Sequence, residues 1–143
     1  MKNALTIFIL IFLLSLYIFF MIMMQPEYLF QGLEYDVRVV NGFTSNSSLP
    51  LVIWCSSKDQ NLGGRALQEG DDFSWSLKAN FWGTAHFLCT IKWDQKRKSF
   101  DAFWVHRDSH RCGPLRRCFW LVKEDGFYFS NDETNWKKEF AWI

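Results

Sequence analysis

Two histidines and two cysteines late in the chain have the residue types and spacing of a metal site. His106, His110, Cys112 and Cys118 could supply the nitrogen and sulfur ligands of a tetrahedral zinc ion. The chain has four cysteines in all, Cys55, Cys89, Cys112 and Cys118. An even number in a small exported domain favours two disulfides over a metal. We therefore expect two bridges and no cofactor, with three pairings open.

Carboxylate pairs and a further histidine are the residues that could support acid–base catalysis. Asp71 and Asp72, like Glu124 and Asp125, lie beside turn-forming residues, where Asp binds local backbone groups. His86 has no serine or cysteine nucleophile that the sequence places against it. We expect no catalytic site, which argues against a secreted hydrolase.

The charge balance argues against a nucleic-acid partner. Lysine and arginine number 16 against 15 acidic residues, so the chain without Lys2 is formally neutral. Lys96–Lys98 and Arg116–Arg117 are local basic spots, and Trp104 lies between them in the sequence. A neutral domain has no global field to attract a polyanion, so we interpret these spots as solvated loop tips.

An apolar segment, Ala4–Met24, interrupted only by Thr6, Ser15 and Tyr17, opens the chain after Lys2. A stretch of about 20 apolar residues is long enough to span a bilayer, whereas its position is typical of a signal peptide. We expect residues 1–25 to be a signal peptide cleaved near Met24 or Gln25, which would make the protein secreted and extracellular. An uncleaved signal anchor, which would hold the protein on a membrane, is the alternative.

From Tyr35 onward the dominant hydrophobic period is two, which is typical of β-strands. Strands are expected at Tyr35–Asn41, Leu51–Cys55, Arg65–Leu67, Phe73–Leu77, Ala85–Trp93, Ser99–Val105, Cys118–Lys123 and Phe127–Ser130, with the tail Trp136–Ile143 closing a sheet edge. Leu51–Cys55 is apolar at every position, which predicts burial on both faces. Alternation along Ala85–Trp93 places Cys89 in the core.

The strand count predicts the fold class. About seven to nine short strands with regular turn signals indicate an all-β protein, a small antiparallel β-sandwich spanning residues 33–143. The connections expected between them include the loop Gly42–Pro50, the charged hairpin tip Asp94–Lys98 and the polar loop His106–Arg117. Asn46-Ser47-Ser48 in the first of these is an acceptor sequence for N-glycosylation.

Four ordered motifs resemble the plant self-incompatibility protein family, the S-protein homologues. The stretch CSSKDQNLG, residues 55–63, resembles the family's C-x-S-K-D-x-D-L-G, with Asn61 at the position of the second Asp. Residues 75–89 resemble its W-S-F…N-x-W-x-T-T-x-F-x-C block, with Leu77 and Ala85 as departures. FDAF at 100–103 and CFWLVKEDGFY at 118–128 resemble its F-D-V-F and C-x-W-x-V-x-E-D-G-x-Y motifs.

The resemblance implies a secreted β-sandwich with two disulfides and no known catalytic activity. The best-understood members of that family are pistil ligands that a pollen surface receptor recognises. We accordingly expect a cell-surface receptor as partner, bound through hydrophilic loops. The candidate recognition residues are Asp94, Gln95, Lys96, Arg97, Lys98, His106, Arg107, His110, Arg116 and Arg117.

Eight tryptophans are many for a chain of 143 residues. Most are expected to fill or border the core of so small a domain, and one or two exposed rings could anchor a partner. Exposed tryptophans also permit a defence or glycan-binding module as the alternative function.

Overall fold

The computed structural model describes residues 2–24, 32–46, 48–79 and 83–143. The chain divides into two compact units, Met1–Gly32 and Leu33–Ile143. The first unit contains the helix α1 (Lys2–Met23), whose most apolar window has a mean hydropathy of 2.9. This helix is long and apolar enough to cross a membrane, and its composition and position are those of a signal segment.

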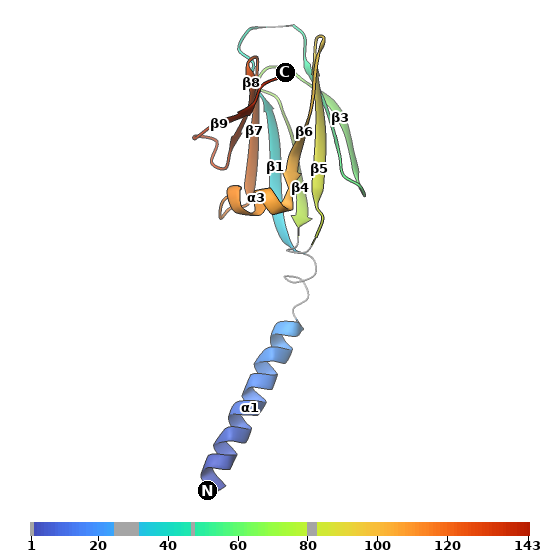
Figure 1. Ribbon diagram of the computed structural model, residues 1–143. Coiled ribbons are helices and arrows are strands. Elements are labelled where there is room, and N and C mark those ends of the chain that lie inside the picture. The colour runs from blue at the N-terminus through green and yellow to red at the C-terminus, as the bar shows by residue number, and fades with distance from the viewer. Residues whose placement is uncertain (1, 25–31, 47, 80–82) are drawn as a thin grey trace. The chain divides into compact units, whose positions relative to one another are not determined.

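The second unit is a two-layered β-sandwich, as the sequence predicted (Figure 1). Its strands are β1 (Leu33–Asn41), β2 (Leu51–Ser56), β3 (Asn61–Leu67), β4 (Asp72–Ala79), β5 (His86–Trp93), β6 (Lys96–Trp104), β7 (Arg117–Lys123), β8 (Gly126–Ser130) and β9 (Lys137–Phe140). One sheet has the order β4-β1-β7-β8-β9 and the other β3-β2-β5-β6. Every neighbouring pair is antiparallel except β1 and β7, which are parallel.

The core lies between the sheets and follows the period-two pattern of the sequence. Val37 and Val39 of β1 face Cys89 and Ile91 of β5, all of them fully buried. Trp120 of β7 is buried at the centre of an aromatic cluster. The prediction that Cys89 lies in the core is confirmed.

Burial of Leu51–Cys55 on both faces was a wrong prediction. Leu51, Ile53 and Cys55 are buried, but Val52 is 38% exposed and Trp54 is half-buried on the outer face of the sheet. That outer face carries Trp54 beneath the guanidinium of Arg97, 5.2 Å from the ring centroid. An apolar residue therefore occupies an outward position because a cation from β6 packs over it.

The hairpin tip is shorter than the predicted Asp94–Lys98. Only Asp94 and Gln95 form the turn, and Lys96–Lys98 are the first residues of β6. Asp94 has a φ of 53°, in the left-handed region that tight hairpin turns use. Two residues therefore suffice for the connection, and the basic run continues the strand. β3 likewise begins at Asn61, earlier than the predicted Arg65–Leu67.

The predicted polar loop His106–Arg117 contains a helix, α3 (Val105–Arg111), which follows β6 directly. Val105, expected at the end of a strand, is the first residue of this helix. Two turns are too short to establish a helical period in the sequence. Tertiary contacts of Asp108 stabilise α3 instead, as described below.

Candidate recognition surface

Both predicted disulfides are present. Cys55 and Cys89 are directly opposite on β2 and β5, with Cα atoms 4.1 Å apart. Cys112 and Cys118 join the end of α3 to the start of β7, with Cα atoms 4.9 Å apart. Because Cys112 and Cys118 are bonded to each other, these two thiols are not available as zinc ligands.

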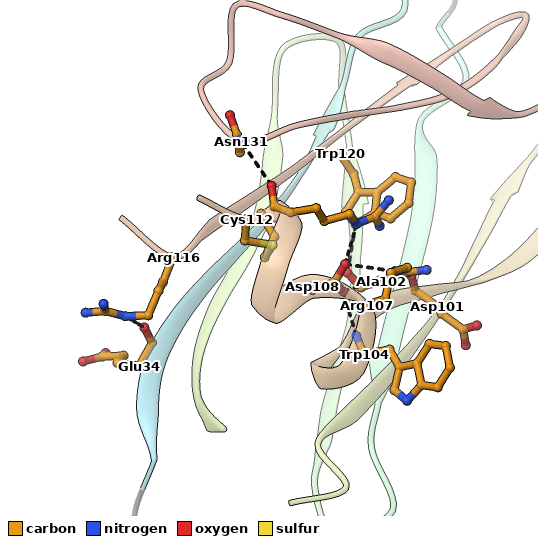
Figure 2. The surroundings of a disulfide bond; sticks show 12 residues. Glu34, Asp101, Ala102, Trp104, Arg107, Asp108, Cys112, Arg116, Trp120 and Asn131 are labelled. Atoms are coloured by element: carbon orange, nitrogen blue, oxygen red, sulfur yellow. Dashed lines mark hydrogen bonds and ion pairs between the residues drawn. A yellow bond between two sulfur atoms is a disulfide. The ribbon is translucent and has the colours of Figure 1, made fainter. Parts of the chain in front are cut away.

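A fully buried carboxylate fixes α3 to the end of β6. Asp108 accepts hydrogen bonds from the backbone N–H of Trp104 at 2.8 Å, from Arg107 Nε at 2.9 Å and from Arg111 Nε at 2.5 Å. Figure 2 shows Asp108 with Arg107 and Trp104, in the surroundings of the disulfide of Cys112. Two guanidinium groups therefore compensate one buried charge, which is the condition under which such a charge is tolerated.

Arg111 connects the same helix to the opposite sheet. Its guanidinium lies 3.7 Å from the centroid of the Phe129 ring and 5.2 Å from that of Trp120. Its Nη1 donates to Glu139 at 3.1 Å, and its carbonyl accepts from Asn131 Nδ2 at 3.0 Å. One side chain thus contacts β7, β8 and β9.

Side chains also occupy the outer edge of β6. Arg107 Nη2 donates to the carbonyl of Asp101 at 2.7 Å, and Trp120 Nε1 donates to the carbonyl of Ala102 at 2.9 Å. We call this side of the sandwich, formed by β6, α3 and β9, the sealed edge. Two of its backbone acceptors, the carbonyls of Asp101 and Ala102, are bonded to side chains and are therefore not available to pair with another strand.

Outside these contacts, the same segment exposes a group of side chains to solvent. Trp104 is 43% exposed and Leu115 is 69% exposed, while His106, His110 and Arg117 are also exposed. In Figure 2 the ring of Trp104 points away from Asp108. We call these five residues the α3 surface.

Trp104 lies between two histidines on this surface. Its ring centroid is 6.4 Å from that of His86, the residue opposite it on β5, and 5.8 Å from that of His106. His86 Nε2 lies 2.6 Å from Asp101 Oδ1. A large half-exposed ring with polar neighbours is the type of group that anchors protein interfaces.

The other predicted basic residues of this segment are structural. Arg107 is bonded to Asp108 and to the Asp101 carbonyl. Arg116 has a φ of 53° and donates through Nε to the carbonyl of Glu34 at 2.9 Å. Sequence reasoning did not single out Trp104 or Leu115 as recognition residues, and their only signal was apolar character beside a polar stretch.

The two predicted recognition segments do not form one surface. The Asp94–Gln95 turn precedes β6 and α3 follows it, so they lie at opposite ends of the sandwich (Figure 1). At ~3.3 Å per residue the strand separates them by about 26 Å. Lys96 and Lys98 also lie over aromatic rings, 5.5 Å from the centroid of Trp93 and 5.4 Å from that of Phe140.

The predicted glycosylation acceptor, Asn46, is exposed in a loop tied to the β7–β8 turn. Glu124 accepts from the backbone N–H groups of Thr44 at 2.8 Å and Ser45 at 3.2 Å. Burial raises the pKa of Glu124, but these hydrogen bonds outweigh burial and lower the pKa below its usual value. Ser47 of the acceptor sequence lies outside the described residues.

Comparisons with known proteins agree with these features. A family model described as "Plant self-incompatibility protein S1" matches residues 36–142. The chain is 32% identical over 105 residues to "Self-incompatibility protein S1" of Papaver rhoeas, covering 71% of this chain and 73% of that protein. It is 34% identical over 115 residues to "S-protein homolog 1" of Arabidopsis thaliana, covering 76% and 74%.

A third relative, "S-protein homolog 2" of Arabidopsis thaliana, is 37% identical over 91 residues. That alignment covers 62% of this chain and 56% of the relative, so the chain spans little more than half of that protein's length. No solved structure matches the chain.

Proposed function

Because the chain belongs to the plant self-incompatibility protein S1 family, we propose that it is a secreted recognition ligand, bound by a receptor on a cell surface through the α3 surface. One observation supports this above the others. Exposed Trp104 and Leu115 belong to a segment that Asp108 and the Cys112–Cys118 bridge hold in place. A surface that is already ordered loses little conformational entropy when a partner binds.

The composition of the α3 surface suits a protein partner. Trp104 supplies apolar area, and His106 lies beside it. Exposed His110 and Arg117 add further groups that bind carboxylates and carbonyls. Interfaces commonly combine such an aromatic anchor with a polar rim. The formal neutrality of the domain does not favour a polyanion as the partner.

Binding, rather than catalysis, is the output that we propose. His86 and Asp101 form an exposed pair, 2.6 Å apart, with side chains 48% and 45% exposed. Within the described residues, neither side chain is hydrogen-bonded to a hydroxyl or thiol that could act as a nucleophile. The pair therefore contributes to the surroundings of Trp104 in this proposal.

A surface-binding assay tests the proposal. Labelled full-length protein, with both disulfides oxidised, is applied to pollen tubes and to leaf protoplasts of the source plant. The substitutions Trp104→Ala and Leu115→Asp should each lower cell-bound label by roughly tenfold or more, the effect of losing an interface anchor. Val52→Asp, a substitution of an exposed apolar residue on the outer sheet face, is the matched control and should leave binding unchanged.

The same assay separates the two ends of the sandwich. Variants of the α3 surface that fold normally but bind like the native protein would reject this surface. If replacing Lys96 and Lys98 abolishes binding instead, the hairpin end is the recognition site.

A second experiment addresses export. The N-terminal sequence of the protein recovered from plant cells should begin near Pro26, with the protein in the extracellular fluid. Recovery of intact α1 in the membrane fraction would instead establish a tethered surface module.

A further inference from the structure

A cleft opens at the margin of the sandwich where β4 ends and β5 begins. Two edge strands, β3 and β4, lie on the same side of the sandwich, because Arg65 of β3 donates to the carbonyl of Asp72 of β4. The cleft has a volume of about 840 Å³ and is bounded by the second half of β4, the β2–β3 turn and the start of β5. This volume lies within the usual range for ligand sites, ~300–1,000 Å³.

The backbone of β4 presents alternate residues to this side. Within its sheet, β4 pairs with β1. The backbone N–H of Asn41 donates to the carbonyl of the opposite residue, Asp71, at 2.9 Å, so every second pair of opposite residues along β1 and β4, counted from this one, is hydrogen-bonded. Alternation along an antiparallel ladder then directs the N–H and C=O groups of Ser74 and Ser76 away from β1. The carbonyl of Asp72 points the same way, because Arg65 of β3 donates to it at 2.9 Å.

The next two residues of β4 whose backbone groups point away from β1, Ser74 and Ser76, have no such cap among the described residues. Within the described ranges, the backbone N–H and C=O groups of Ser74 and Ser76 have no hydrogen-bond partner, and only the Ser76 hydroxyl is bonded, to Asp36 at 2.6 Å. We call Ser74–Ser76 the open edge. A row of donors and acceptors at strand spacing is a template for another strand.

We propose that the open edge binds an extended polypeptide segment of another protein, which adds to β4 as a further strand. The added strand would direct every second side chain towards the cleft. Apolar residues, Ala85 and Phe87 among them, line part of the cleft. Lys58 and Asp59 of the β2–β3 turn also line it, and their side chains are exposed and form no ion pair within the described residues. The segment that fits alternates apolar residues with charged ones.

The surroundings favour a single segment over a second copy of this chain. Arg65 joins β3 to β4 at Asp72 and so blocks the end of the edge nearest that residue. The β2–β3 turn borders the cleft beside the second half of β4. One short strand pair between two copies buries far less than the ~1,000 Å² expected of a stable interface.

A peptide experiment tests this inference. A random twelve-residue library displayed on phage is selected against the full-length oxidised protein, and the selected peptide is synthesised. We expect N-methylation of backbone amides at alternate positions to weaken binding by roughly tenfold each, with little effect at the positions between. A period of two is the signature of strand addition. Failure to select any peptide, or an N-methylation profile without that period, would overturn the inference.

Two substitutions at one position test the protein side. Ser76→Pro removes an N–H that points away from β1, which an edge strand tolerates, and should abolish peptide binding. Ser76→Thr keeps both the N–H and the hydroxyl and should bind the peptide like the native protein. Because the N-methylation profile uses unaltered protein, the test does not depend on Ser76→Pro folding.

Two further measurements separate this inference from a dimer of this chain and from the α3 surface. A concentration-dependent dimer in light scattering that Ser76→Pro abolishes would overturn the inference in favour of a second copy. Trp104→Ala should leave peptide binding unchanged, because the open edge does not depend on the α3 surface. Loss of one site therefore does not imply loss of the other.

Discussion

Beside the sealed edge, side chains bind two carbonyls of β6, whereas on β4 one arginine binds the carbonyl of Asp72, and the backbone groups of Ser74 and Ser76 in the open edge have no partner within the described residues. Arg107 and Trp120 bind the carbonyls of Asp101 and Ala102 on β6. On β4 the Asp72 carbonyl is bonded in this way, by Arg65. Both edges belong to the same sandwich, and they differ in what the chain adds beside them.

The two edges differ in how many other contacts support them. The sealed edge requires a buried carboxylate, two arginines, a helix and a disulfide. The open edge is short and borders a cleft with charged residues, which limits indiscriminate pairing. Stability should therefore depend strongly on the sealed edge and weakly on the open one.

The largest expected effect is that of Asp108→Ala. Removal of the carboxylate leaves Arg107 and Arg111 without their shared anion, which typically costs about 3–5 kcal/mol for a buried pair. Urea unfolding, followed by tryptophan fluorescence with disulfides intact, measures the free energy of unfolding. Asp59→Ala at the cleft is the control and should change that free energy by less than about 0.5 kcal/mol. Equal losses of unfolding free energy in Asp108→Ala and Asp59→Ala would contradict the expectation that stability depends more on the sealed edge.

The disulfides should differ in the same measurement. The Cys55–Cys89 bridge spans a sequence separation of 34 and the Cys112–Cys118 bridge a separation of 6. From loop-closure entropy, replacing both cysteines of the longer loop by alanine should cost about 4 kcal/mol, and of the shorter about 2 kcal/mol. A greater loss from the shorter loop would mean that this bridge holds α3 by more than chain entropy.

The two carbonyl caps provide a smaller and more direct comparison. Trp120→Phe leaves the buried carbonyl of Ala102 without its donor, which should cost about 1–3 kcal/mol. Arg65→Ala exposes the Asp72 carbonyl to water, so its cost should stay below about 1 kcal/mol. If the two losses are the same, the caps are energetically equivalent and the distinction between the edges fails.

Lowering the pH should have the smallest effect on stability among these tests. The backbone N–H groups of Asn135 and Thr134 lower the pKa of Asp132, in the β8–β9 connection, well below its usual value. Its stabilising contribution is therefore complete above the unfolded-state pKa of about 3.9, and is lost as pH falls towards the folded-state value. Thermal unfolding between neutral and strongly acidic pH should show a weaker acid dependence for Asp132→Asn than for the native protein. The same acid dependence in both would contradict this role.

Much of the sandwich was predictable because its strands alternate. The pattern of β5 placed Cys89 in the core, and the strands expected at Cys118–Lys123 and Phe127–Ser130 correspond to β7 and β8. The same logic fails for Trp104. A β-bulge in the β5–β6 pair shifts the register, so Ala102 and Phe103 are both buried and Trp104 is exposed.

The two edges were not predictable for a different reason. Asp108 is acidic and adjoins other polar residues, so the sequence indicates a solvated loop. Its burial depends on Arg111, which the helix places correctly, and on the packing of α3 against β6. The open edge depends on sheet order, which strand patterns do not specify.

The parallel pairing of β1 with β7 sets an order on folding. The first strand to be synthesised, β1, pairs with β4 on one side and with β7, which comes much later in the chain, on the other. In the β1–β7 pair Asp36 lies beside Arg117. Hairpins such as β5–β6 need only neighbouring residues, whereas the five-stranded sheet requires almost the entire chain. Pulse-labelled hydrogen exchange should therefore detect protection in β5–β6 before β1. Until β7 emerges from the ribosome, the nascent protein carries an incompletely paired first strand, and this interval is when a chaperone would be needed.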